Sequence, residues 1–120
     1  MTHKLNHKIA LEWFEAFNQH DLEKLLKLYH DNAWHYSPKL KVHKPETLGL
    51  IQGKEELRAW WKNAFERLPS LVYEPTNFIS NESQIFMEYI RKVDGEEHMM
   101  VGEVLEIVNG LIMSYRVYHS

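Results

Sequence analysis

The sequence predicts an α+β domain in which three N-terminal helices pack on one face of an antiparallel sheet. Three amphipathic stretches with helical spacing come first, and four strand-like segments separated by turn signals follow. The length of 120 residues predicts one domain, 1–120, and 44% of the residues are hydrophobic, which is enough for a packed core.

The helices are predicted from the spacing of their apolar residues. The first spans 8–18, and Asp21 is a favourable N-cap for the second, whose apolar stripe extends to Tyr29. The third follows Gly53 and ends before Pro69, which cannot continue a helix. Its apolar stripe comprises Leu57, Trp60, Trp61, Ala64, Phe65 and Leu68.

Strands are expected between and after these helices. A short strand covers 33–36 and leads into a loop, 37–52, which is long enough to form the rim of a pocket. Asp94-Gly95 and Asn109-Gly110 are dipeptides typical of hairpins. The remaining strands are placed at 72–79, 84–92, 97–107 and 111–119.

Alternation along the last three strands assigns their more apolar face to the interior. Three-residue loops with a bulge, ending at Gly95 and Gly110, keep odd positions opposite odd positions. The interior set is Ile85, Met87, Tyr89, Arg91, Val93, Met99, Val101, Glu103, Leu105, Ile107, Leu111, Met113, Tyr115, Val117 and His119. The expected opposite pairs are Glu103 with Tyr115, and Val101 with both Met87 and Val117.

Glu103 is the acidic residue in this interior set. An ionised carboxylate on an apolar surface is unfavourable by several kcal/mol unless it is paired, so burial raises its pKa and the neutral form can donate a hydrogen bond. Glu103 is therefore a candidate functional group. The alternative is a structural carboxyl bonded to Tyr115 or to a backbone amide.

Short motifs in a fixed order run through nearly the whole chain. They are Trp13-Phe14-Glu15-Ala16-Phe17-Asn18, Asp21-Leu22, Leu28-Tyr29, Asp31-Asn32-Ala33, Gly53, Asn109-Gly110, Ile112, Tyr115-Arg116 and Tyr118-His119. In this order they resemble the nuclear transport factor 2-like superfamily, particularly its SnoaL-like and ketosteroid isomerase-like branches. The resemblance implies a cone-shaped α+β barrel with a strongly curved sheet, a ligand held between helices and sheet, and a homodimer formed through the outer sheet face.

The resemblance also implies roles for particular positions. Ketosteroid isomerase has a tyrosine on its first helix, a catalytic aspartate after its first strand and a protonated acid on a late strand. These positions correspond to Trp13, Ser37 and Glu103, so only the late acid is retained. Ser37 cannot abstract a carbon-bound proton unaided, which argues against that steroid mechanism. The polyketide cyclase branch uses an acid on a late strand, and Glu103 is compatible with that role. The epoxide hydrolase branch uses an Asp-Arg-Asp arrangement, for which this sequence offers Arg91 and Glu103 but no second acid.

We expect three catalytic residues: Glu103 as acid or base, Tyr115 as its hydrogen-bond partner and His35 as a second proton-transfer group. Structural roles stay open for His35 at the rim, for His119 at a frayed end and for Arg91 reaching water. The expected ligand-binding residues are Trp13, Phe17, Ser37, Trp61, Phe65, Met87, Tyr89, Arg91, Val101, Val117 and His119.

Composition argues against several other classes of protein. The formal net charge is −3 and no run of Lys or Arg is present, so no nucleic-acid partner is expected. The absence of cysteine, of a signal-peptide pattern and of any run of ~18 apolar residues predicts a cytoplasmic protein without membrane contact. The histidines lack metal-ligand spacing, and neither a metal nor a cofactor is expected.

Two functions of different classes remain open. The first is a cofactor-independent isomerase or cyclase-type acid/base enzyme acting on a small hydrophobic carbonyl compound, and the second is a non-catalytic ligand-binding or carrier module. A dimeric scaffold whose pocket is filled by its own aromatic side chains is a third reading. Arg91 and the lysines at 39, 41 and 44 favour a small hydrophobic or weakly anionic ligand.

Overall fold

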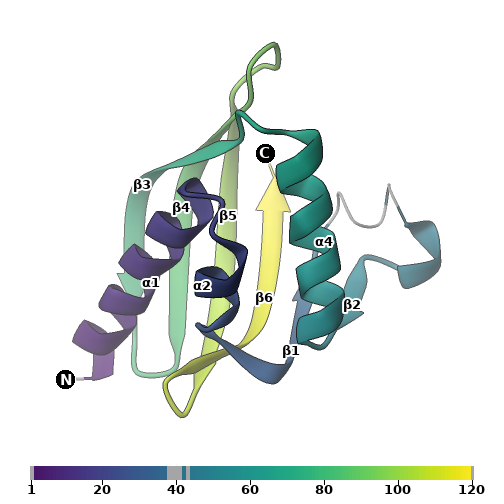
Figure 1. Ribbon diagram of the computed structural model, residues 1–120. Coiled ribbons are helices and arrows are strands. Elements are labelled where there is room, and N and C mark those ends of the chain that lie inside the picture. Colours follow the sequence, from purple (N-terminus) through teal and green to yellow (C-terminus); the bar gives the residue numbers. More distant parts are fainter. Residues whose placement is uncertain (1, 38–41, 43, 120) are drawn as a thin grey trace.

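The computed structural model describes residues 2–37, 42 and 44–119. Three helices lie on one face of a curved six-stranded sheet (Figure 1). The helices are α1 (Thr2–Asn18), α2 (Leu22–Leu26) and α4 (Lys54–Arg67), with a short 3-10 helix at Pro45–Thr47. The strands are β1 (Tyr29–Tyr36), β2 (Leu50–Gln52), β3 (Val72–Ser80), β4 (Gln84–Lys92), β5 (Met99–Val108) and β6 (Leu111–His119).

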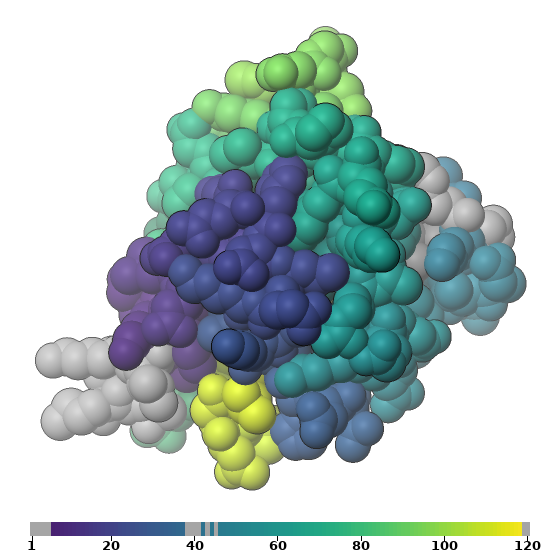
Figure 2. Space-filling model, in the orientation of Figure 1, coloured from purple at the N-terminus to yellow at the C-terminus, as the bar shows by residue number. Residues whose placement is uncertain are grey.

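The sheet has the order β2-β1-β6-β5-β4-β3, and it is open rather than closed into a barrel. Neighbouring strands are antiparallel except β1 and β6, which are parallel. The expectation of a wholly antiparallel sheet is therefore wrong at this pair. Parallel neighbours need a long connection, and most of the chain lies between β1 and β6. The space-filling view shows α1, α2 and α4 side by side over the inner sheet face (Figure 2).

The helix ends follow their local chemistry. The carboxylate of Asp21 accepts a hydrogen bond from the backbone N–H of Lys24 at 3.2 Å, which caps α2 as expected. Gly53 precedes α4 with a φ of 92°, a conformation that side chains rarely tolerate. Helix α2 ends at Leu26, so Tyr29 starts β1 instead of extending the helical stripe. No helix among the described residues is long and apolar enough to cross a membrane.

The first strand and the following segment differ from the sequence prediction. Strand β1 begins at Tyr29 rather than at residue 33, and the expected loop at 37–52 contains both the 3-10 helix and β2. The backbone N–H of Ser37 donates to the carbonyl of Gly49 at 2.9 Å, which continues the antiparallel β1–β2 pairing. These elements were missed because the segment has neither a clear alternation nor a helical period.

The inward faces of β4 and β5 are as expected, since Ile85, Met87, Tyr89, Arg91 and Val93 are buried, as are Val101, Glu103, Leu105 and Ile107. The expected register is wrong by two residues at both hairpins. Glu103 lies opposite Met87 and Val117, Tyr115 lies opposite Leu105, and Val101 lies opposite Tyr89 and His119.

Turn geometry explains the shift at the second hairpin. Val108 pairs with Leu111, so the loop consists of Asn109 and Gly110 alone, with φ values of 53° and 79°. A two-residue loop of this kind suits the twist of paired strands. A register irregularity follows between Glu106 and Ile107, and it restores odd-to-odd pairing further along. At the start of β6, Ile112 is consequently buried, while the expected Leu111 and Met113 are only half-buried.

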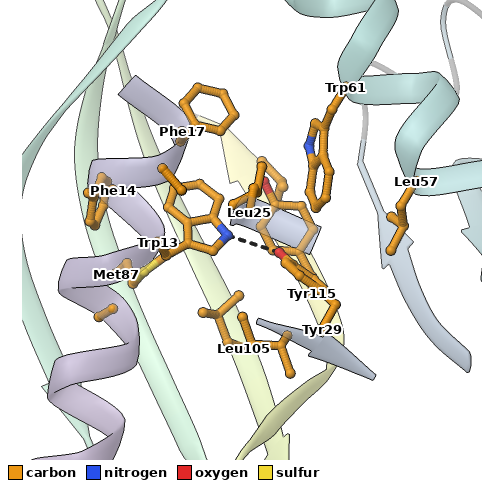
Figure 3. Packing of buried hydrophobic residues seen from close by; sticks show 14 of the residues in the cluster. Trp13, Phe14, Phe17, Leu25, Tyr29, Leu57, Trp61, Met87, Leu105 and Tyr115 are labelled. Carbon is orange, nitrogen blue, oxygen red and sulfur yellow. Dashed lines mark hydrogen bonds between the residues drawn. The ribbon is translucent and has the colours of Figure 1, made fainter. Parts of the chain in front are cut away.

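Trp13 lies at the centre of the core beneath the helices (Figure 3). Its indole N–H donates to the hydroxyl of Tyr29 at 2.9 Å, and its ring stacks on Phe17 with centroids 5.1 Å apart. The hydrogen bond joins α1 to the first residue of β1, and both side chains are fully buried. Removing either side chain therefore leaves a buried polar group of the other without a hydrogen-bond partner.

Asn18, the last residue of α1, fixes the position of β3. Its side-chain amide donates to the carbonyl of Tyr73 and accepts from the backbone N–H of the same residue, both at 2.8 Å. The side chain thus replaces a strand neighbour at the sheet edge. This pairing holds Tyr73, whose ring stacks on Phe17 at 4.0 Å, against the end of the helix.

Replacing Trp13 by Phe is expected to lower the free energy of unfolding by about 2–4 kcal/mol, because a void forms and the Tyr29 hydroxyl loses its buried partner. Urea denaturation measures the change. The same substitution at half-buried Trp60 is the control and should be milder. A loss below about 1 kcal/mol for Trp13→Phe would show that this hydrogen bond is not central to the core.

Candidate functional site

A cavity of about 260 Å³ lies between α4 and the inner face of the sheet. This is near the lower end of the sizes typical of small-molecule sites. Its wall combines aromatic and aliphatic side chains with a few polar groups, so the self-filled scaffold is not the arrangement seen here. The lining residues are Phe17, His35, Ser37, Trp60, Trp61, Ala64, Arg67, Leu68, Leu71, Tyr73, Tyr89, Arg91, Glu96, Val101, Tyr115 and Val117.

Most of the residues expected to bind a ligand line this cavity, but three are elsewhere. Trp13 is held in the core by Tyr29, and Met87 is fully buried lower on β4. Phe65 packs on Phe17 and stacks on His20, behind the cavity wall. The side chain of His119, and residues 39 and 41 of the expected lysine cluster, lie outside what the structure describes.

Glu103 is fully buried and lies behind two phenols that line the cavity. Its Oε1 accepts a hydrogen bond from the hydroxyl of Tyr115 at 2.8 Å and another from the hydroxyl of Tyr89. Burial raises the pKa of Glu103 to about 8, although the two phenol hydrogen bonds lower it. The carboxyl is therefore mostly neutral at pH 7 and reaches the cavity only through its tyrosine partners.

The phenols of Tyr89 and Tyr115 connect this carboxyl to the cavity. Burial, and next the nearby Glu103, hold the pKa of both hydroxyls well above the usual value for tyrosine. Both hydroxyls therefore keep their protons at any physiological pH. They are hydrogen-bond donors fixed in position by packing, because Tyr89 stacks on Tyr73 at 4.1 Å and Tyr115 stacks on His35 at 4.2 Å.

His35 is almost fully buried on β1, next to Tyr115 in the parallel pairing with β6. Neither ring nitrogen has a hydrogen-bond partner among the described residues. Burial lowers its pKa to about 3, so the ring is neutral at pH 7. A neutral imidazole has one donor and one acceptor nitrogen, and in His35 both are buried. His35, Tyr115 and Glu103 thus form one contiguous group, of which His35 and Tyr115 line the cavity.

Charged residues gather at the end of the cavity where the lining is exposed. Arg91 is only 5% exposed, and its Nη1 donates to Oε1 of Glu96 at 2.8 Å. Glu96 lies on the connection between β4 and β5, and its side chain is 46% exposed. Arg67, exposed at the end of α4, donates from Nε to the side chain of Asn63 at 2.7 Å. Arg91 therefore points into the molecule and does not reach bulk water.

Several lining residues were not identified from the sequence, and for most of them a signal existed. Trp60, Ala64 and Leu68 recur at i, i+4 and i+8 along one flank of the α4 stripe, of which only Trp61 and Phe65 were expected to bind a ligand. Tyr73 pairs with inward-pointing Arg91 and so shares its face. Glu96 belongs to a turn, where neither alternation nor helical period predicts direction. No group of three or more potential metal ligands occurs among the residues that the structure describes.

Solved structures with the same fold cover most of this chain. A SnoaL-like protein of unknown function from Burkholderia thailandensis is 23% identical, with a TM-score of 0.88 over 98% of this chain and 95% of its own. A provisionally assigned polyketide cyclase from Sinorhizobium meliloti is 16% identical, with a TM-score of 0.78 over 92% and 94%. A provisionally assigned ketosteroid isomerase from Kribbella flavida is 15% identical, with a TM-score of 0.79 over 98% and 78%.

At these identities the solved structures show the fold alone. A search of curated proteins finds no significant match. The family model of the SnoaL-like domain matches residues 10–115, which is most of the sequence. Its range includes most of α1, all of α2 and α4, and both tyrosines that donate hydrogen bonds to Glu103. The chain therefore belongs to the SnoaL-like family.

Proposed function

We propose that this protein binds a small, mostly apolar carbonyl compound in the cavity and moves a proton on it without a cofactor, as isomerases and cyclases do. The observation that carries the proposal is the group at the inner wall: two phenols share one buried, neutral carboxyl, and an unpartnered imidazole lies beside them. Apolar walls favour the body of such a compound, and the polar groups orient its oxygen.

The phenols supply the electrophilic part of this chemistry. A neutral Glu103 carries a proton that it can donate to one of its two phenol partners. The hydroxyl of that phenol, Tyr89 or Tyr115, is then free to donate to a carbonyl oxygen in the cavity. Fixed donors aimed at an oxygen on which negative charge develops stabilise the transition state strongly, because they need no reorganisation. Glu103 acts through the phenols and is a positioning residue.

His35 supplies the proton-accepting part. A ring nitrogen of His35 takes a proton from the carbon next to the carbonyl, the C–H electron pair moves towards the oxygen, and an enolate forms. The pKa of His35 is low in the empty cavity because of burial, but an enolate beside the ring favours the imidazolium and raises that pKa. Return of the proton to the same carbon gives exchange, and its return to another carbon gives isomerisation.

The alternative function is a carrier that binds the same kind of molecule and releases it unchanged. Two observations favour it: the position after the first strand is Ser37 rather than an acid, and Glu103 does not itself line the cavity. A base with a pKa of about 3 is also far from the value that suits proton abstraction near pH 7. The provisional assignments of two structural neighbours favour the enzyme.

The outer sheet face supports a second copy of the chain as partner. Met100 is 42% exposed, Tyr118 is 52% exposed and Ile79 is 62% exposed. Register places Met100 beside Ile90, Tyr118 beside Gly102, and Ile79 beside Phe86, all on the face opposite the helices. Exposed apolar side chains that gather over several strands mark protein interfaces. We propose that two copies associate through this face.

The catalytic proposal predicts that the protein accelerates exchange of the α-protons of 2-tetralone for deuterium, measured by NMR. Glu103→Gln should lower the exchange rate by about tenfold, because the amide N–H that replaces the carboxyl O–H is a weaker hydrogen-bond donor to the phenols. The wild-type rate should fall as the pH passes about 8, where Glu103 ionises, and the Gln variant should lack this fall.

Glu106→Gln is the matched control, since Glu106 lies on the same strand and pairs with Arg116. Binding of 2-tetralone is followed separately by tryptophan fluorescence, because Trp60 and Trp61 line the cavity. Exchange no faster than in buffer, with binding retained, would contradict the enzyme and favour the carrier. Absence of both would contradict the proposed function altogether.

Opposite pKa shifts at His35 and Glu103 predict a stability plateau. From pH 4.5 to about 8 the folded state holds a proton on Glu103 that the unfolded state releases, so this group lowers stability as pH rises. From pH 6.5 down to about 3 the unfolded state holds a proton that His35 lacks when folded, so this group lowers stability as pH falls. The two effects cancel between pH 4.5 and 6.5.

Urea denaturation should therefore show a fall in the free energy of unfolding of roughly 1 kcal/mol per pH unit from pH 6.5 to about 8. Glu103→Gln should remove this alkaline fall relative to wild type, and Glu106→Gln should keep it. An alkaline fall that persists in the Gln variant would show that Glu103 is already ionised in the folded protein.

The proposed dimer is tested by introducing a charged side chain on the outer sheet face. Met100→Lys should weaken association about tenfold or more, because a cation would be buried between apolar surfaces. Light scattering coupled to size-exclusion chromatography over a range of concentrations gives the mass. Leu11→Lys, on the exposed side of α1 and 50% exposed in the native protein, is the control. A monomeric wild type, or a dimer indifferent to Met100→Lys, would reject this interface.

A further inference from the structure

The Arg91–Glu96 ion pair joins two parts of the molecule that differ in solvent access. The guanidinium is anchored on the inner face of β4 and its side chain is 6% exposed, whereas the Glu96 side chain is 46% exposed. A cation buried to this degree needs a counter-charge. Glu96 provides that counter-charge from a turn at one end of the molecule, where the β4–β5 connection projects beyond the helices (Figure 1).

Both members of the pair line the cavity, and so does Arg67. The lining therefore carries two positive charges and one negative charge, a net of +1, in a chain whose formal net charge is −3. The remaining polar lining groups include His35 and two phenols, which are neutral at pH 7 for the reasons given above. The charge of the cavity is thus concentrated at its exposed end and is positive.

The carboxylate of Glu96 accepts a hydrogen bond from the Arg91 guanidinium, as the carboxylate of a bound ligand would. The hydrogen bond from Nη1 uses one of five N–H donors in a planar fork that can engage a carboxylate with two parallel bonds. The base of the turn is anchored, because the backbone N–H of Asp94 donates to the hydroxyl of Ser70 at 2.9 Å. Glu96 itself is an exposed residue outside the strands, and its backbone N–H donates to the carbonyl of Val93 at 3.0 Å, so its side chain can turn outward without disturbing a strand.

We propose that Arg91 is the binding site for a carboxylate on the ligand, and that Glu96 is an internal stand-in which the ligand displaces. This inference rests on the proposed function and deepens it, since it names the substrate class: a small apolar carboxylic acid held with its anionic end at the mouth. Arg67 adds a second positive charge at the same end. The body of the ligand then extends along the wall that Trp61 and Tyr115 form, towards His35.

If two carboxylates compete for one guanidinium, substituting Arg91 and substituting Glu96 should change the affinity for an anionic ligand in opposite directions. Arg91→Gln removes the shared cation and should weaken binding of an anionic ligand. Glu96→Gln removes the competitor but keeps the shape of the side chain, so it should strengthen binding of the same ligand. A purely structural ion pair predicts instead that both substitutions act in the same direction, by loosening the turn. The sign of the Glu96→Gln effect therefore separates the two roles.

The experiment uses naphthalene-2-carboxylate and naphthalene-2-carboxamide, which share shape but differ in charge at pH 7. Binding to the full chain is measured by tryptophan fluorescence and calorimetry. Wild type should bind the carboxylate more tightly than the amide. Arg91→Gln should weaken carboxylate binding by about tenfold or more, and Glu96→Gln should strengthen it several-fold, while both leave amide binding within about twofold.

Glu97→Gln is the matched control, because it makes the same charge change at the next, exposed residue of the turn, which does not line the cavity. It should leave both affinities unchanged. Arg91→Lys keeps the charge and guards against misfolding of the Gln variant, and it should retain part of the preference for the carboxylate.

Three results overturn the inference. They are equal binding of the two naphthalene probes to wild type, weaker carboxylate binding in Glu96→Gln, and equal strengthening by Glu97→Gln. In each case amide binding is retained, so the proposed function stands while the carboxylate site fails. Failure of wild type to bind either probe rejects both the carboxylate site and an apolar binding cavity.

Discussion

The buried carboxyl of Glu103 is the constraint on which the arrangement of the inner wall depends. A carboxyl without solvent must be neutral or hydrogen-bonded, and here it is both. Its two partners come from the strands on either side of β5, Tyr89 from β4 and Tyr115 from β6. One polar side chain therefore ties three neighbouring strands together through their side chains and sets where the two phenol rings meet the cavity.

Aromatic stacking then makes this wall rigid. Phe17, Tyr73 and Tyr89 form a continuous stack with centroid spacings of 4.0 and 4.1 Å, and His35 stacks on Tyr115 on the other side of Glu103. Asn18 holds the middle member of the stack by pairing with the backbone of Tyr73. The phenol hydroxyls are thus fixed by packing rather than by the carboxyl alone, which is the preorganisation that binding and acid/base chemistry both require.

The sequence was sufficient for the number and order of the helices, for the inward face of β4 and β5 and for the burial of Glu103, because each depends on a local period or on one neighbouring residue. It did not give two of the helix ends, since α1 begins at Thr2 rather than at residue 8 and α2 ends at Leu26 rather than reaching Tyr29. It was not sufficient for register, since a two-residue turn at Asn109 followed by a bulge gives the same parity as the expected three-residue loop. The sequence predicted that Tyr115 would contact Glu103, and the contact is present although Tyr115 lies opposite Leu105. A phenol is long enough to reach the diagonal neighbour. Glu96 could not be placed, because nothing in a turn predicts which way a side chain points.

Desolvation explains why charge is distributed along the cavity as it is. At the inner wall, burial shifts the pKa of Glu103 upward and that of His35 downward, so both groups lose their charge at pH 7. At the exposed end, the guanidinium of Arg91 is a permanent positive charge, and Glu96 supplies its counter-charge. A molecule that enters must match both ends at once. Its apolar body and neutral oxygen suit the inner wall, whereas a negative charge on it is stable only beside Arg91, where a counter-charge is available.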